Sequence, residues 1–222
     1  MREGHSVSRE TSASRLVGTL FPSSDKDIKR YVDLLATRGA ERGLIGPREI
    51  PRLWSRHIVN CAVIEAAFDS HSTVADIGSG AGLPGLVLAM ARPDLRVTLV
   101  EPLLRRSTFL LETVDELELG NVDVVRARAE ELHGDRVFGS VTARALAPLG
   151  RLVRWCWPLV EEAGQLIAIK GGRAEEELAE HAALIVRLRP AARADVTRYG
   201  EEVGAPATTV VRLQSSRNVV QG

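Results

Sequence analysis

Hydrophobic residues follow two different spacings along this chain, and their alternation from residue 73 onward predicts an α/β fold. Short runs rich in Val, Ile and Leu predict strands, at 73–77, 96–100, 122–125, 140–143 and 165–169. The segments between them have apolar residues at helical spacing and predict helices, at 83–91, 103–117, 149–159 and 173–187. Strands and helices that alternate in this way indicate a doubly wound, mainly parallel sheet with helices on both faces.

Two further apolar runs near the C-terminus complete a predicted seven-stranded sheet. They cover Ala194–Tyr199 and Thr208–Leu213 and lie close enough in sequence to pair as an antiparallel ribbon. The C-terminal edge of the sheet is therefore expected to be antiparallel.

The region before residue 71 has helical periodicity only. It predicts helices over Asp25–Arg38 and Pro51–Phe68, separated by a break at Gly39–Pro47. We therefore divide the chain into a flexible N-terminus over residues 1–22, which is polar and Ser-rich to about Arg15, and an N-terminal helical extension over 23–70. A single globular domain follows over residues 71–222.

The composition is that of an ordinary globular protein. Of 222 residues, 45% are hydrophobic and 26% are charged, and the formal net charge is zero. No apolar run reaches the length of a membrane span, and Cys61 and Cys156 form no metal-binding or disulfide motif. We therefore expect a cytoplasmic protein without a membrane partner or a bound metal, in which any contact with RNA depends on local basic charge.

A glycine-rich turn follows the first predicted strand. Asp76 ends the strand, and Gly78, Gly80, Gly82 and Gly85 precede the next predicted helix. Such a turn lets a ligand approach bare backbone. A carboxylate beside it would repel a pyrophosphate but attract the sulfonium and ammonium groups of S-adenosylmethionine. The turn therefore favours a methyl-donor site that includes Asp76, Gly78 and Gly80.

The second predicted strand also ends on a carboxylate, Glu101. Strand ends meet at one edge of a doubly wound sheet, so Glu101 should face the glycine turn, where it can accept both hydroxyls of a ribose. The residues alone leave open that Glu101 only caps the following helix. They also leave open a dinucleotide-dependent oxidoreductase, because Gly80, Gly82 and Gly85 match the G-x-G-x-x-G pattern.

Five short motifs lie between residues 56 and 171. They are R-H-I at 56–58, the turn D-I-G-S-G-A-G-L-P-G at 76–85, R-A-E-E at 128–131, T-A-R-A at 142–145 and I-K-G at 169–171. In this order and spacing they resemble the RsmG family, also called GidB, which comprises the bacterial small-subunit ribosomal RNA guanine-N7 methyltransferases. The resemblance implies the class I methyltransferase fold, whose sheet has an antiparallel C-terminal edge, and S-adenosyl-L-methionine as methyl donor. It also implies rRNA methylation at N7 of guanine-527 in 16S ribosomal RNA, which gives 7-methylguanosine.

The resemblance places the family's donor site on Gly78, Leu83, Ala129, Glu130 and Arg144. Backbone groups at Ala129 and Glu130 could bond the adenine edge, and Leu83 could form an apolar wall. Without the resemblance, the residues alone favour a solvated helix-start charge for Glu130 and a surface salt bridge for Arg144. Guanine N7 already holds a free lone pair, so we assign no catalytic residue and take Arg144 as the nearest candidate.

Basic residues gather in the second half of the helical extension. From Arg38 to His57 there are five arginines and two glutamates. A solvated helix face would explain this run, and His57 could be a core histidine or the partner of another side chain. The interpretation that we follow is RNA binding by Arg48, Arg52, Arg56, His57, Lys170 and Arg173. The expected partner is 16S ribosomal RNA or the small ribosomal subunit. No protein partner is implied, and we expect a monomer.

Overall fold

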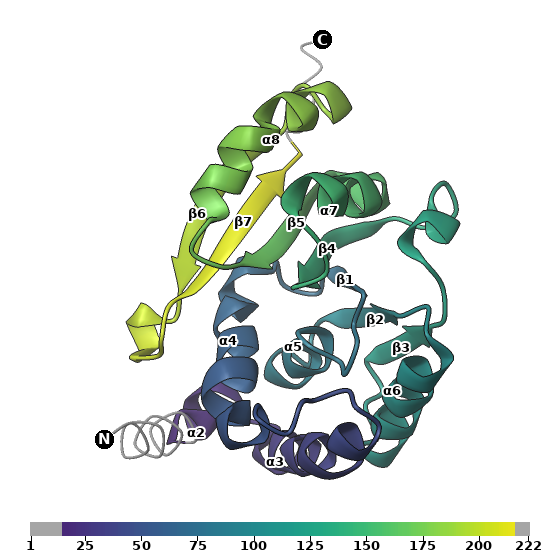
Figure 1. Cartoon of the computed structure of the whole chain (residues 1–222), viewed down its shortest axis with the longest axis vertical. Helices are drawn as coiled ribbons and strands as arrows, with labels where there is room; N and C mark the ends of the chain where they lie inside the picture. The colour runs from purple at the N-terminus through teal and green to yellow at the C-terminus, as the bar shows by residue number, and fades with distance from the viewer. Residues whose placement is uncertain (1–14, 216–222) are drawn as a thin grey trace.

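The structure is a computed structural model, and it describes residues 15–215 of the chain. Seven strands form one sheet in the order β3-β2-β1-β4-β5-β7-β6 (Figure 1). The strands are β1 Thr73–Ile77, β2 Arg96–Val100, β3 Val122–Val125, β4 Phe138–Arg144, β5 Val160–Lys170, β6 Arg193–Tyr199 and β7 Thr208–Gln214. Strands β1 to β5 are parallel, whereas β7 lies between β5 and β6 and is antiparallel to both. The predicted fold class and the antiparallel C-terminal edge are confirmed.

Strand β5 begins earlier than the apolar run that predicted it. Its first residues, Val160–Gly164, include three exposed positions, and only the part from Gln165 onward pairs continuously with β4. An exposed strand end does not need apolar side chains, so hydrophobicity alone does not reveal it.

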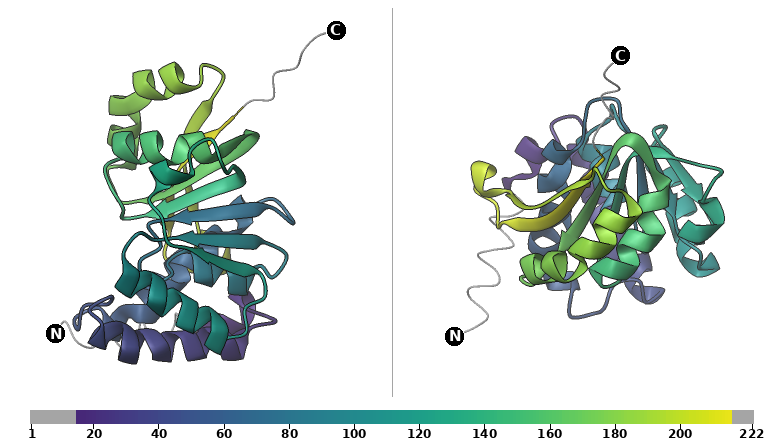
Figure 2. Two further views of the ribbon diagram at one scale, coloured as in Figure 1. Left: turned by 90° about the vertical axis from the view of Figure 1, so that its right-hand side faces the viewer. Right: turned by 90° about the horizontal axis from the view of Figure 1, so that it is seen from above.

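Two groups of helices lie apart from each other (Figures 1 and 2). The helices are α2 Val17–Leu20, α3 Asp25–Leu34, α4 Val59–Ala62, α5 Gly85–Ala91, α6 Leu104–Glu116, α7 Leu149–Cys156 and α8 Ala174–Leu188. Helix α5 contacts α3 and α4, whereas α7 contacts α8.

The sheet contributes to two separate hydrophobic cores, because successive side chains of a strand point to opposite faces of the sheet. Val74 and Ile167 belong to the core beneath α3, α4 and α5, which we call the extension face. Their neighbours Ala75 and Ala168 belong to the core beneath α7 and α8, which we call the α7–α8 face. Burial on both faces explains why the strands are almost continuously apolar.

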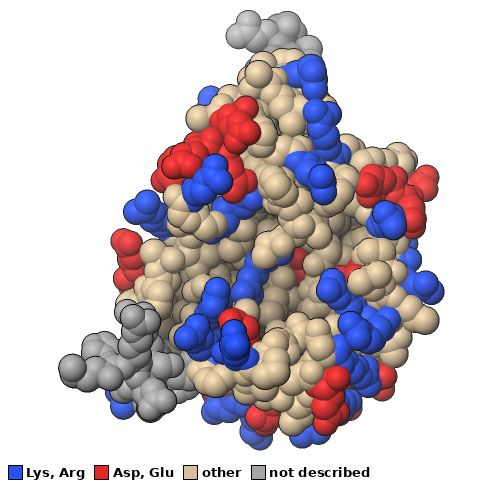
Figure 3. Space-filling view, viewed as in Figure 1, with Lys and Arg blue, Asp and Glu red and all other residues tan. Residues whose placement is uncertain are grey.

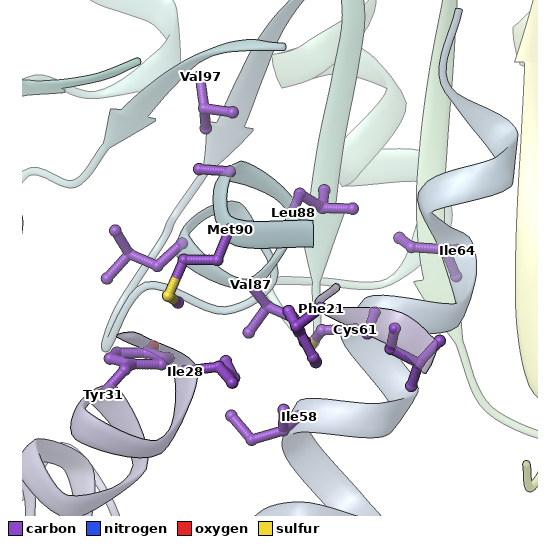
Figure 4. Close-up of a cluster of buried hydrophobic side chains, with 14 of the residues drawn as sticks. Phe21, Ile28, Tyr31, Ile58, Cys61, Ile64, Val87, Leu88, Met90 and Val97 are labelled. Atoms are coloured by element: carbon purple, nitrogen blue, oxygen red, sulfur yellow. The ribbon is translucent and has the colours of Figure 1, made fainter. Parts of the chain in front are cut away.

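The helical extension packs against α5 through a fully buried cluster (Figure 4). Ile28 and Ile58 of the extension, with Phe21 just before it, lie around Val87 of α5, and Leu88 belongs to the same core. The predicted helix over 25–38 is α3 followed by a π-helical turn at Leu35–Gly39. The predicted helix over 51–68 is a chain of short helical pieces, of which only α4 is α-helical: Ile50–Arg52, Leu53–Ile58, α4 and Val63–Ala67.

The predicted flexible N-terminus is wrong for its last residues. Residues 1–14 lie outside the described part of the chain, but Val17, Leu20 and Phe21 are all buried. These three apolar side chains gain more from the core than from water, so α2 joins the fold. Within residues 15–215, no helix is long and apolar enough to cross a membrane.

Candidate functional site

The glycine turn lies at the carboxyl end of β1, and Asp76 is completely buried beneath it. Its Oδ2 accepts a hydrogen bond of 2.9 Å from the backbone N–H of Gly85, the first residue of α5. A Cβ at position 85 would lie 2.3 Å from Leu99 Cδ2, so only glycine allows this approach. The other oxygen, Asp76 Oδ1, is buried with no hydrogen-bond partner among the described residues.

Burial raises the pKa of Asp76 to about 7, although the Gly85 N–H and the charge of Arg144 oppose the shift. A buried carboxyl oxygen without a partner is costly in a native protein. A cationic ligand at this end of the turn would supply the missing partner and favour the ionised form. The residue therefore fits the ammonium or sulfonium of the predicted donor and does not fit a pyrophosphate.

Glu101 bonds the glycine turn from the end of β2, as the sequence predicted. Its side chain is almost fully buried, and it accepts 3.0 Å hydrogen bonds from Gly80 N–H at Oε2 and from Leu103 N–H at Oε1. Gly80 has a φ of 59°, a conformation that side-chain-bearing residues rarely adopt. Glu101 also bonds the segment that leads into α6, so the capping role that the sequence left open is present, and ribose binding stays a prediction. Each carboxylate oxygen keeps a further lone pair for a ribose hydroxyl.

A cavity of about 290 Å³ lies beside Glu101. It is lined by four predicted donor-site residues, Gly78, Glu101, Ala129 and Glu130. Sequence reasoning missed other lining residues, among them Leu103, Arg106, Leu146 and Trp155. Apolar walls with a carboxylate at one end suit an adenine nucleoside.

The described lining of that cavity does not include four other predicted donor-site residues, which are Asp76, Gly80, Leu83 and Arg144. Asp76 instead points to the extension face of the sheet, because it stands two positions after Val74 on the same strand.

Arg144, at the end of β4, lies among residues of the helical extension. Its Nη1 donates to Cys61 Sγ at 3.1 Å, and its Nη2 lies 2.6 Å from His57 Nδ1. The Nε2 of His57 is in turn 2.9 Å from Glu49 Oε2. The other oxygen, Glu49 Oε1, pairs at 3.1 Å with Arg56, an arginine of the predicted RNA-binding run. Arg144 therefore takes its partners from the extension and is not a surface ion pair.

Tyr31 is a second contact from the extension, and sequence reasoning missed it. It is fully buried on α3, and its hydroxyl donates a 2.7 Å hydrogen bond to the carbonyl oxygen of Ala81 in the glycine turn. In the sequence it reads only as one of the apolar positions of a helix. Cys61 and Glu49 were missed for a similar reason, because their contacts with Arg144 and His57 depend on how the extension packs on the sheet.

The predicted RNA-binding residues have different surroundings. Arg48 and Arg52 are exposed, and Arg173 is exposed and pairs with Glu176. The side chain of Lys170 is only 8% exposed, donates to the carbonyl oxygen of Ala147 and pairs with Glu177 at 2.7 Å. The structure thus brings Arg56 and His57 close to Arg144, but it holds the amine of Lys170 inside an ion pair.

A hollow near the middle of one face has Lys and Arg side chains on both of its sides (Figure 3). This arrangement agrees with a local basic surface on a chain of zero net charge. Among residues 15–215, no group of three or more His, Cys, Asp or Glu side chains could hold a metal ion.

Comparisons with known proteins identify a family for this chain. The family model GidB, described as rRNA small subunit methyltransferase G, matches residues 24–194. The ribosomal RNA small subunit methyltransferase G of Nocardioides sp. is 54% identical over 209 residues, which are 93% of this chain and 83% of that protein. The protein of the same name from Thermobifida fusca is 54% identical over 202 residues, which are 91% of this chain and 83% of that protein.

Solved structures agree at the level of the fold. A putative O-methyltransferase from Klebsiella pneumoniae superposes with a TM-score of 0.61 at 12% identity, over 94% of this chain and 98% of that one. At this identity the likeness shows the fold alone, which is that of the class I methyltransferases.

Proposed function

The chain belongs to the rRNA small subunit methyltransferase G family, and from this membership we propose that it methylates N7 of a guanosine in 16S ribosomal RNA. The family makes the chain a methyltransferase that uses S-adenosylmethionine. The guanine-527 position and the N7 atom are the family's target, and they are the finer part of the proposal.

The observation that carries the proposal is the buried carboxyl of Asp76 beneath the glycine turn, whose Oδ1 has no hydrogen-bond partner among the described residues. An unpartnered anionic oxygen suits a cationic methyl donor, whereas a dinucleotide would bring phosphate to the same turn. The antiparallel β7 also differs from the all-parallel order of dinucleotide-binding sheets. The oxidoreductase alternative therefore has no support beyond the glycine pattern.

We assign the donor's nucleoside to the cavity. Glu101 would hold the ribose, and Gly78 and the backbone at Ala129 and Glu130 would meet the base. Asp76, Gly80, Leu83 and Arg144 would surround the remainder of the donor and the transferred group. When bound, the donor supplies an electrophilic methyl group on its sulfonium.

The protein's part in the reaction is to orient the acceptor. Guanine N7 holds its lone pair in the ring plane, so no proton has to be removed before attack. Catalysis then comes from positioning and from tolerance of the positive charge that passes to the guanine. Burial and the charge of Arg144 lower the pKa of His57. The reaction does not need this histidine as a base, because the N7 lone pair is already free.

RNA would approach the extension through Arg48, Arg52 and Arg56, whose charges can replace counterions on phosphates. Arg173 would add a contact at the end of β5. Lys170 would act there only by exchanging its Glu177 partner for a phosphate. We expect a monomer to be sufficient.

The test is to map methylated nucleotides after incubation of the protein with donor and with small ribosomal subunits that lack the modification. We expect one new 7-methylguanosine and a single-turnover rate that is nearly constant from about pH 6.5 to 8.5. Methylation of a different atom, or no incorporation into the RNA, would show the proposal to be wrong.

A further inference from the structure

Arg144 has an unusual neighbour for a cation, because it lies against a histidine ring. The guanidinium carries only hydrogen-bond donors. The 2.6 Å contact between Arg144 Nη2 and His57 Nδ1 therefore requires Nδ1 to be unprotonated and to accept. A protonated ring would place two positive charges in contact in a site where the His57 side chain is only 13% exposed.

Glu49 selects the tautomer that makes this contact possible. Its carboxylate is an acceptor, so His57 Nε2 must carry the ring proton and donate it across 2.9 Å. The hydrogen bond with His57 also lowers the pKa of Glu49, which keeps the carboxylate ionised. A carboxylate that fixes a histidine tautomer, so that the opposite nitrogen can bind, is a known way to orient a functional group.

Both ring nitrogens of His57 are thus engaged inside the protein, and neither is left to contact RNA. The other two hydrogen bonds of Arg144 are weaker, since Cys61 Sγ is a weak acceptor and the carbonyl oxygen of Arg56 is 3.4 Å away. His57 offers the shortest of the three contacts and the one with a fixed direction.

We propose that His57 is a positioning residue that accepts from Arg144 and holds its guanidinium at the carboxyl end of β4, with Glu49 fixing the tautomer. This inference rests on the proposed function, in which Arg144 borders the reacting groups. It moves His57 from the predicted RNA-binding set to a role inside the protein, and it makes Glu49 part of the site.

Two substitutions of His57 separate this role from simple packing. Asparagine carries its Oδ1 on Cγ, as histidine carries Nδ1, so His57→Asn keeps the acceptor for Arg144 and loses the donor to Glu49. Glutamine extends one carbon further, so His57→Gln reaches Glu49 and loses the acceptor. We expect the single-turnover rate at saturating RNA and donor to fall roughly tenfold or more in His57→Gln and about threefold or less in His57→Asn. Equal losses in the two variants would overturn the proposal.

A coupling measurement asks whether His57 acts through Arg144. In an Arg144→Lys background, His57→Gln should lower the rate by about twofold or less beyond the lysine substitution, because the group that it positions is gone. If the two substitutions instead lower the rate by independent factors that multiply in the double variant, the proposal is wrong. His71→Gln serves as the control, since His71 is exposed at the opposite end of β1 and should leave the rate unchanged.

A spectroscopic measurement on the protein alone does not depend on methyl transfer. Nitrogen chemical shifts of the His57 ring at about pH 7.5 should show a proton on Nε2 and none on Nδ1. The Arg144 guanidinium signals should be sharp in wild type and His57→Asn and broadened in His57→Gln. A ring protonated at Nδ1, or Arg144 signals that are the same in all three, would overturn the inference even if RNA is methylated. Failure of methylation with these signals intact would instead reject the proposed function.

Discussion

The two faces of the sheet end differently at its carboxyl edge. On the α7–α8 face, the cavity is formed by residues at the ends of successive strands and by backbone groups, with Glu101 held by two amides. On the extension face, Asp76 and Arg144 are met by side chains from a distant part of the chain, among them Tyr31 and His57. The first region is built from local connections, and the second depends on the docking of the helical extension.

This difference predicts how far the effect of a substitution extends from its own position. A change on the α7–α8 face should alter donor binding and little else, because its polar groups are bonded by neighbouring backbone. A change on the extension face should be felt by several side chains, because each is the partner of another. Four variants test this contrast.

The largest effect is expected for Asp76→Asn, in the pH dependence of stability. The folded pKa of about 7 lies above the unfolded value of 3.8, so the folded state binds more protons between them. The stabilisation is fully present below the unfolded pKa and is lost as pH rises through 7. From pH 4 to 8, the free energy of unfolding of the wild type should fall relative to the variant by up to about 4 kcal/mol.

Urea unfolding at several pH values measures this difference. His57 acts in the opposite direction, because its pKa is lowered by burial and its stabilisation is lost as pH falls below its unfolded value of about 6.5. Comparing wild type with Asp76→Asn removes that contribution, which both share. Asp115→Asn, on the exposed side of α6, is the control, and parallel curves for Asp76→Asn and wild type would reject the prediction.

Glu101→Gln tests the α7–α8 face. A neutral amide can accept only one of the two backbone N–H bonds and loses the charge for a ribose. Donor affinity should fall by about 1.5 to 3 kcal/mol, roughly 10- to 150-fold. Calorimetry with S-adenosylmethionine measures this affinity. The matched control is Glu112→Gln on α6, where the native Glu112 pairs with Arg42. Unchanged affinity in Glu101→Gln would mean that Glu101 only caps the α6 segment.

The double substitution Arg52→Ala with Arg56→Ala tests whether the basic run binds RNA. Losing two phosphate contacts should flatten the salt dependence of RNA binding. The fold loss of RNA affinity between 50 and 200 mM salt should be roughly ten times smaller in the variant than in wild type. Donor affinity should stay constant. Filter binding of a 16S RNA fragment provides the measurement, with Arg187→Ala on α8 as the control. An unchanged slope would leave the run as a solvated helix face.

Tyr31→Phe should have the smallest effect. It removes one buried hydrogen bond to the Ala81 carbonyl and should lower the free energy of unfolding by about 1 kcal/mol. Donor affinity should weaken slightly as well, because the bond comes from the extension but holds the donor turn. The chain has only one other tyrosine, Tyr199, and Tyr199→Phe is the control. A stability loss with no change in donor binding would separate the two regions more fully than we expect.

The sequence predicted the candidate site best where the position of a residue follows from the end of a strand. Glu101 could be predicted to meet the glycine turn, because parallel strands bring their carboxyl ends to one edge. Lys170 ends β5 at the same edge and was predicted to bind RNA, yet its amine pairs with Glu177. That pairing depends on where α8 packs, and the strand pattern contains no information about it.

Glu49 shows the same limit more clearly. In the sequence it is one of two negative charges among five arginines, and its distance of eight positions from His57 matches no helical pairing. The intervening π-helical turn at Leu53–Ile58 brings the two side chains together, and no residue pattern in that segment predicts a π-helix.

The position of β7 within the sheet also has a consequence during synthesis. β5 is made before α8, β6 and β7, yet the edge that β5 turns away from β4 is covered by β7, the last of the described strands to be synthesised. Until then the apolar segment Leu166–Ile169 presents unpaired backbone, which is a template for association with other chains. In the folded chain the hairpin of β6 and β7 therefore protects this edge of the sheet, and we expect the nascent chain to be more prone to aggregate before the hairpin pairs with β5.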